Sequence, residues 1–357
     1  MMNRRLKQYV LIFIYTIAIC VLTGEITLRV QGNYEVYFDN YNEKYMSAYD
    51  NTTMWPRSNY RNISFTTQKS EFKYDNEYNS EGLRDIEHNR SKLKGEYRIM
   101  ALGDSFTEGF GVVYDDTWCS VLKRTLNKDS TNRVNIINGG FSGSDPFFSY
   151  RIFRERLISY NPDLVLLVIN GSDIMDVVVR GGNERFLNDS AVIYKPKPKL
   201  DYLFSKSHLF RFIIMKIYGY NWFLIGPQER PGRLKEAKNN LAFVMDDFIT
   251  LTSENSIDFA VIFHPFKKDI LGGKYCRNFD FIKSELVKNN IKFYDLLEFY
   301  QGKIDADNIY EYYWKEDGHL TPKGNVMFAE GIENFILNSH YLPEKLKSLS
   351  NGRLIDN

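Results

Sequence analysis

The stretch RIMALGDSFT, residues 98–107, decides the predicted fold of this chain. Its first half, residues 98–102, is a short apolar run, and Gly103, Asp104 and Ser105 follow it directly. An apolar strand that leads into a helix is typical of a parallel sheet with helices on both faces. In the first turn of that helix, unpaired backbone N–H groups and the helix dipole favour negative charge near Ser105. Asp and Ser are also ordinary helix caps, so this stretch alone defines no catalytic site.

The rest of the chain repeats this alternation of short apolar strands and helices. We expect further strands at residues 134–137, 164–169, 259–263 and 291–294, the first of them closed by the Asn-Gly-Gly sequence at 138–140. We expect helices at residues 118–126, 147–160, 234–251 and 281–288. The pattern predicts an α/β fold, a three-layer α/β/α sandwich with a mainly parallel sheet, in which ligands bind beyond the carboxyl ends of the strands.

Composition narrows the class of protein. Lys and Arg together number 46 and Asp and Glu 45, so no charge excess favours nucleic acid as a partner. Three cysteines, Cys20, Cys119 and Cys276, do not make a disulfide framework, and the five scattered histidines lack metal-ligand spacing. We therefore expect no metal site.

The N-terminus has the pattern of a membrane-targeting segment. Arg4, Arg5 and Lys7 precede an apolar run over residues 9–22. A full span takes about 17 to 25 residues, which the run reaches if residues 23–28 extend it. No small-x-small cleavage site follows, so an uncleaved anchor in the lipid bilayer is favoured over a cleaved signal peptide or a buried helix. The first two alternatives place the rest of the chain outside the cytoplasm, in the periplasm or at the cell surface.

We divide the chain into four segments. Residues 1–29 are the anchor, residues 30–95 a polar stalk and lead-in, residues 96–340 the main domain, and residues 341–357 a tail. An insertion interrupts the main domain at residues 175–231 and is rich in aromatic residues, among them Tyr202, Phe204, Phe210, Phe212, Tyr218, Tyr220, Trp222 and Phe223. The insertion forms either a subdomain with its own core, a cap over the site, or a surface that lies against the membrane.

A second motif lies near the C-terminus. Glu316 and Asp317 precede His319, and an acid two or three residues before a histidine can orient the imidazole and stabilise its protonated form. Such a short motif is common in surface loops and is weak evidence by itself. It gains meaning beside Ser105, because a histidine base activates a serine nucleophile.

Together these segments resemble the SGNH (GDSL-like) hydrolase family in its membrane-anchored bacterial form. Four family blocks appear in the family's order, at residues 103–107, 138–143, 162–173 and 317–319. The lead-in NSEGLR, residues 79–84, is also similar to a segment of such members. The resemblance covers residues 79–335 without the insertion, and it implies an SGNH/flavodoxin-like sandwich.

The resemblance also assigns roles within the predicted site. It implies Ser105 as the nucleophile, His319 as the base and Asp317 as the acid. It implies that the backbone N–H groups of Ser105 and Gly143 stabilise the oxyanion, with a side-chain donor as the third group.

Two positions depart from the family pattern. Ser172 stands where the family has an oxyanion-binding Asn, and Asn170, which faces the same side of an extended backbone, is the alternative donor. Losing one oxyanion donor typically costs about 2.7–4 kcal/mol. In the last block Glu316 holds the usual acid position, whereas Asp317 fits a minority Asp-x-His pattern seen in polysaccharide O-acetyltransferase relatives. We prefer Ser172 as donor and Asp317 as acid.

Three further residues have competing interpretations. His264, after the fourth predicted strand, is the rival base, although a buried or capping role is favoured. We expect Asp173 to hydrogen-bond nearby backbone and Asp295 to lie in a turn or cap a helix.

The resemblance implies a serine ester hydrolase that acts through an acyl-enzyme and requires neither a cofactor nor a metal. With the extracytoplasmic placement, it suggests O-acetyl groups on surface or exported polysaccharide as the substrate. A polysaccharide O-acetyltransferase would use the same residues and is the first alternative. A catalytically inactive carbohydrate-binding or assembly protein is the second, because the third block is altered.

Overall fold

The computed structural model describes residues 4–32, 62, 64–128, 133–180, 182, 200–219, 223, 225–226, 228–275, 277–339 and 341. The chain splits into two compact units, one of Met1–Ala48 with Tyr194–Pro231 and one of Tyr49–Ile193 with Gly232–Asn357. Most of the predicted stalk up to residue 63, and the predicted tail beyond residue 341, lie outside the described residues.

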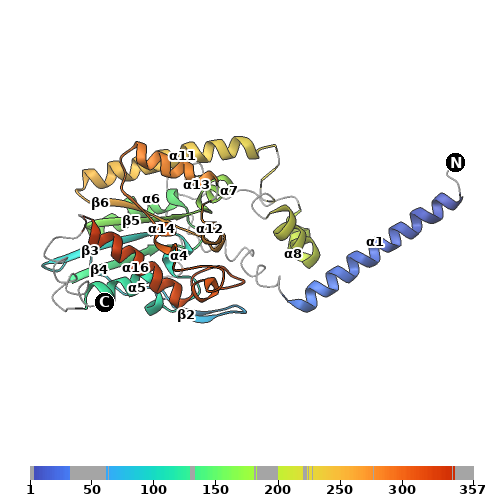
Figure 1. Ribbon diagram of the computed structural model, residues 1–357, viewed down its shortest axis with the longest axis horizontal. Helices are drawn as coiled ribbons and strands as arrows, with labels where there is room; N and C mark the ends of the chain where they lie inside the picture. Colours follow the sequence, from blue (N-terminus) through green and yellow to red (C-terminus); the bar gives the residue numbers. More distant parts are fainter. Residues whose placement is uncertain are drawn as a thin grey trace. The chain divides into compact units, whose positions relative to one another are not determined.

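The larger unit contains a five-stranded sheet in the order β4-β3-β5-β6-β7 (Figure 1). Its strands are β3 (Glu96–Gly103), β4 (Arg133–Gly140), β5 (Leu164–Asn170), β6 (Asp258–His264) and β7 (Phe293–Asp295). All four strand pairings are parallel, which confirms the predicted α/β fold. The carboxyl ends of β3, β4 and β5 therefore lie side by side at one edge.

The strand predicted at 134–137 is longer than expected, because residues 138–140, which were expected to close it, belong to β4. Gly139 and Gly140 pair in register with Leu102 and Gly103 of β3. A Cβ at Gly140 would come within 2.4 Å of the backbone nitrogen of Glu108. The missing side chain allows the helix after β3 to pack against β4.

Helices cover both faces of the sheet (Figure 1). One face carries α5 (Trp118–Leu126) and α16 (Pro322–Asn338), and the other carries α6 (Pro146–Glu155) and α11 (Arg230–Glu254). The remaining elements of this unit are α4 (Ser105–Glu108), η2 (Tyr114–Asp116), η3 (Leu157–Tyr160), α7 (Asp173–Arg180), α12 (Lys267–Gly272), α13 (Arg277–Lys288), α14 (Leu296–Tyr300) and α15 (Ile309–Tyr312).

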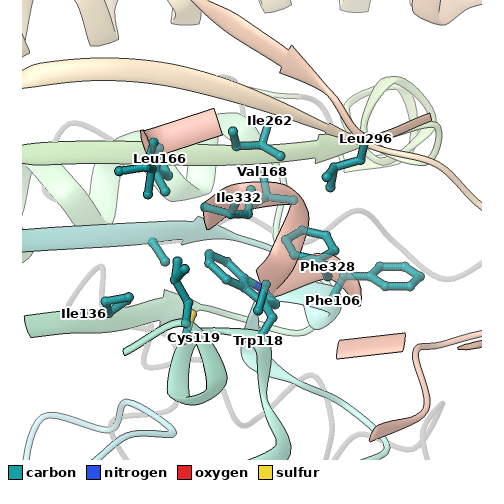
Figure 2. Close-up of a cluster of buried hydrophobic side chains, with 14 of the residues drawn as sticks. Phe106, Trp118, Cys119, Ile136, Leu166, Val168, Ile262, Leu296, Phe328 and Ile332 are labelled. Atoms are coloured by element: carbon teal, nitrogen blue, oxygen red, sulfur yellow. The ribbon is translucent and has the colours of Figure 1, made fainter. Parts of the chain in front are cut away.

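The core beneath α5 and α16 is built from alternate residues of the strands. Trp118 and Phe328 are fully buried with ring centroids 5.0 Å apart, and they face Leu166 and Val168 of β5 (Figure 2). Residues two apart on a strand share a face, so the intervening residues pack against the other helical layer. Strands apolar on both faces are the reason that the sheet is covered twice.

Two local expectations need correction. The helix predicted at 147–160 is broken, since α6 ends at Glu155 and a 3₁₀ turn follows after Arg156, whose φ is −135°. The lead-in is not merely irregular, because β1 (Ser64–Gln68) and β2 (Lys73–Glu77) form an antiparallel hairpin. Each strand of the hairpin is only five residues long and mostly polar, so its sequence gives a weak signal.

The smaller unit contains α1 (Arg4–Gln31), α8 (Asp201–Lys206), α9 (His208–Phe212) and a π-helix, η5 (Ile213–Tyr218). The 28-residue α1 is long and apolar enough to span a membrane, a test that a signal sequence also passes. Within the insertion, the rings of Phe204 and Phe223 stack with centroids 5.3 Å apart. Tyr220 and Trp222 lie outside the described residues.

Candidate active site

The turn after β3 presents Ser105 at the start of α4. Asp104 caps this helix, and its Oδ1 accepts a hydrogen bond from the Phe106 N–H at 2.9 Å. Gly103 approaches Thr107 so closely that a Cβ on the glycine would lie 2.4 Å from the threonine Oγ1. The GDSFT sequence therefore forms a tight strand-to-helix turn with the serine hydroxyl at the carboxyl edge of the sheet.

Ser105, His319 and Asp317 form a hydrogen-bonded chain. His319 Nε2 lies 2.7 Å from Ser105 Oγ, across 214 positions of sequence. His319 Nδ1 lies 2.5 Å from Asp317 Oδ1. The imidazole can thus take the serine proton on one nitrogen while the carboxylate fixes the other nitrogen as a donor.

The carboxylate of Asp317 is ionised in this setting. Burial by itself raises its pKa, but the hydrogen bond and charge of His319 and the charge of Lys69 outweigh burial and hold the pKa below its usual range. An ionised carboxylate stabilises the imidazolium that forms when the histidine accepts a proton.

A tight turn aims the histidine at the serine. Trp314 N donates to His319 O at 2.8 Å, and Gly318 N donates to Trp314 O at 3.1 Å. Gly318 has a φ of +92°, which favours glycine there. Lys267 Nζ donates to the carbonyl oxygens of Trp314 and Lys315 at 2.8 and 2.6 Å, which ties the turn to the segment after β6.

The β1–β2 hairpin also holds this turn, which the sequence did not reveal. Lys69 Nζ lies 2.5 Å from Asp317 Oδ2. Glu71 Oε2 accepts hydrogen bonds from the N–H groups of Glu316 and Asp317, each at 2.8 Å. The paired residues are 245 to 248 positions apart in the sequence. No local pattern could therefore have indicated the contact.

Glu108 links the serine helix to the second block. Glu108 is only 2% exposed. Its carboxylate accepts hydrogen bonds from Ser142 N at 2.7 Å, from Ser142 Oγ, and from Tyr78 OH at 2.8 Å. Gly143 follows at a φ of +76°. Sequence reasoning missed Glu108, although a buried acid one turn after the serine is the kind of residue that orients a neighbouring loop.

The third block is tied to the first through Asn170. Its Nδ2 donates to Asp104 Oδ2 at 2.8 Å, and its Oδ1 accepts from Ser172 N at 2.9 Å and from Ser172 Oγ at 2.8 Å. Asn170 is fully buried, whereas Ser172 is partly exposed. Of the two candidate donors, Ser172 is therefore the one with access to a ligand.

Asp173 has the backbone role predicted for it. Its Oδ2 accepts a hydrogen bond from the Asn170 N–H at 2.6 Å. Burial, reinforced by the charge of Asp104, raises the pKa of Asp173 well above its usual range. Asp295 likewise acts as a cap, since its Oδ1 accepts from Leu297 N at 2.9 Å at the start of α14.

His264 is buried behind the site, as expected. It is 0% exposed and its ring lies 4.4 Å from that of Phe106, centroid to centroid. Neither ring nitrogen has a hydrogen-bond partner among the residues that the structure describes. Burial, with a smaller contribution from the charge of His319, lowers the pKa of His264 to about 3. It is a neutral core residue.

The side chains of His, Cys, Asp and Glu do not form a metal-binding group within the described part of the chain. Aromatic rings flank the imidazole instead. The centroid of the His319 ring lies 4.7 Å from that of Phe106 and 4.8 Å from that of Phe110. The arrangement can perform nucleophilic chemistry with protein groups.

Comparisons with known proteins add the following. No protein-family model and no curated protein sequence matches the chain. Among solved structures, a protein described as lipolytic and of the G-D-S-L family from Desulfitobacterium hafniense is 15% identical, with 66% of this chain and 98% of that chain covered and a TM-score of 0.36. The lipase/acylhydrolase from Enterococcus faecalis is 12% identical, with coverages of 67% and 95% and a TM-score of 0.41.

A two-domain esterase active on acetylated mannans is also similar to the chain. It is 14% identical, with a TM-score of 0.43 and 71% of this chain covered. The match spans 51% of that esterase, about half its length.

Proposed function

We propose that this chain is a serine ester hydrolase of the SGNH type, with Ser105 as nucleophile, His319 as general base and Asp317 as the acid that orients it. The observation that carries the proposal is the continuous chain from Ser105 Oγ through His319 to Asp317, with distances of 2.7 and 2.5 Å. The match of four sequence blocks to that family supports the same assignment.

The mechanism proceeds in two steps. His319 Nε2 takes the Ser105 proton as Oγ attacks the ester carbonyl, and the same nitrogen then protonates the leaving alcohol as the C–O bond breaks. An acyl-enzyme remains on Ser105. His319 takes a proton from water as the water oxygen attacks the acyl carbonyl, and the imidazolium returns that proton to Ser105 Oγ as the acid leaves.

The oxyanion of both steps needs preorganised donors. We assign the backbone N–H groups of Ser105 and Gly143 and the hydroxyl of Ser172. Asn170 is assigned a positioning role, because its amide holds Ser172 on one side and Asp104 on the other. A hydroxyl rotates freely, so Ser172 can turn from Asn170 to the oxyanion when substrate binds.

For the substrate we propose O-acetyl groups on surface or exported polysaccharide. The family resemblance supports this class, and the apolar α1 supports a location outside the cytoplasm. Neither a metal nor a cofactor takes part in the proposed steps.

The decisive test uses the full chain in detergent. It should hydrolyse p-nitrophenyl acetate, and a fluorophosphonate probe should label Ser105 covalently. Ser105→Ala should lose both properties, while Ser284→Ala, at an exposed serine of α13, should still be labelled. Labelling that persists in Ser105→Ala would refute the assignment, and a wild-type chain without labelling would favour the inactive binding protein.

A polysaccharide O-acetyltransferase is the second candidate. It is favoured by the contact of Asp317, rather than Glu316, with His319, because the Asp-x-His spacing occurs in such relatives. The two activities share the acyl-enzyme and differ in its acceptor. A carbohydrate that lowers acetate release while it gains acetyl groups would indicate the transferase.

A further inference from the structure

The end of α1 is joined to the insertion by a cluster of polar contacts. Glu25 Oε2 accepts hydrogen bonds from Ser207 Oγ at 2.8 Å and from Leu209 N at 2.9 Å, and Oε1 accepts from His208 N at 3.1 Å. These backbone donors belong to the first turn of α9, where N–H groups have no partner within the helix. Glu25 therefore caps α9 from another helix.

Neighbouring residues extend this contact along one face of α1. Arg29 Nη2 donates to Lys206 O at 2.6 Å. A Cβ at Gly24 would lie 3.4 Å from Leu209 Cδ1, so the leucine side chain packs against α1 at this glycine. Gly24, Glu25 and Leu28 are half-buried, and the other residues of α1 are exposed. If α1 were removed as a signal peptide, α9 would lose the hydrogen bonds that Glu25 accepts from its first turn.

The segment 200–218 presents apolar and aromatic side chains outward. Tyr202 is 70% exposed and Ile217 is 73% exposed, although Phe204 between them in sequence is buried against Phe223. The other exposed apolar residues of this segment are Leu200, Leu203, Ile213 and Tyr218. Exposed cations, Lys206 and Lys216, lie among them. Apolar, aromatic and basic side chains together suit the boundary between lipid and water.

We propose that α1 remains attached as a membrane anchor and that residues 200–218 lie on the same bilayer, held to the anchor by Glu25. The two parts of this surface are continuous, since α9 contacts α1 at Gly24, where the uncharged stretch of α1 ends. The 28 residues of α1 extend about 42 Å, enough to cross the hydrocarbon core. The occupant of the exposed apolar surface is thus lipid, and the proposal is independent of the reaction at Ser105.

The first test measures lipid contact directly. An environment-sensitive fluorophore is attached to Ile217→Cys in the full chain, with Cys20 and Cys276 replaced by serine, in vesicles of phosphatidylcholine and phosphatidylglycerol. The matched control is Val287→Cys on α13, 66% exposed in the larger unit. We expect blue-shifted emission and quenching by brominated lipid at position 217 and neither at 287. Aqueous emission at both positions would overturn the proposal.

The second test measures the Glu25 contact. In the same cysteine background, Gly24→Cys and Leu209→Cys should form a disulfide on mild oxidation in membranes, because a Cβ at 24 lies 4.0 Å from Leu209 Cγ. Adding Glu25→Ala should lower the yield several-fold, whereas Glu254→Ala on α11 should not. The mass of the membrane-bound chain should include α1. A chain that has lost α1, or a yield indifferent to Glu25, would contradict the proposal.

Discussion

Lys69, at the tip of the β1–β2 hairpin, forms an ion pair with Asp317, the carboxylate that contacts His319. Lys69 Nζ lies 2.5 Å from Asp317 Oδ2, while Asp317 Oδ1 lies 2.5 Å from His319 Nδ1. The same ammonium group lies 4.8 Å from the centroid of the Phe110 ring, which packs beside His319. The carboxylate of Asp317 thus contacts two groups at once, the ammonium group of Lys69 and the imidazole of His319.

The first prediction follows from these two contacts. In Lys69→Met, Asp317 loses the ammonium group that contacts its Oδ2, so its carboxylate is held less firmly against His319 Nδ1. The kcat for p-nitrophenyl acetate should fall by about tenfold to a hundredfold, because a misplaced imidazole takes the serine proton less readily. Lys73→Met, a change of an exposed lysine on the same hairpin, should leave kcat in place. An unchanged kcat in Lys69→Met would remove Lys69 from the positioning of Asp317.

The second prediction separates the two acids before His319. Asp317→Asn should lower kcat by roughly 10²- to 10⁴-fold because an amide cannot stabilise the imidazolium. Glu316→Gln should change kcat little, since Asp317, and not Glu316, contacts His319 Nδ1. Steady-state hydrolysis of p-nitrophenyl acetate measures both. The reverse ranking would make Glu316 the acid.

The third prediction concerns the altered third block. Ser172→Ala should lower kcat by about tenfold to a hundredfold with a small change in KM, because the donor acts mainly on the developing oxyanion. Ser172→Asn restores an amide with a longer reach and should match or exceed the wild-type kcat. Equal rates in Ser172→Ala and wild type would remove Ser172 from the oxyanion hole.

The fourth prediction uses the buried histidine. His264 is charged in the unfolded chain below its ordinary pKa of 6.5 but stays neutral in the fold down to about pH 3. The unfolded state therefore binds the extra proton, and stability falls as pH drops through that window. Between pH 7 and pH 5 the wild type should lose about 2 kcal/mol more than His264→Phe.

Urea denaturation at the two pH values measures this difference. The phenylalanine fits a site already lined by aromatic rings, including Phe106 and Phe328. His264→Phe should also keep esterase activity, because the base is assigned to His319. An inactive but folded His264→Phe would revive His264 as the base.

Much of the fold could be predicted because its signals are local. Each of the apolar runs at 98–102, 164–169 and 259–263 is a strand, since a strand apolar on both faces must be buried between two layers. Where a signal was mixed, prediction failed. The strand expected to close at 138–140 continues through Gly139 and Gly140, which pair with β3. At Gly140 a side chain would collide with the backbone of α4, a tertiary contact that local sequence does not report.

The sequence by itself determined the alternation of strands and helices. It also singled out Ser105, between a strand and a helix, as a candidate nucleophile and His319, after two acids, as a candidate base. Only the tertiary structure decided that their side chains meet, that Asp317 contacts the imidazole, and that Lys69 contacts that carboxylate. The physical reason is distance along the chain. Hydrophobic periodicity reports which face of an element is buried, whereas contacts between residues more than two hundred positions apart depend on strand order and on how turns direct their side chains.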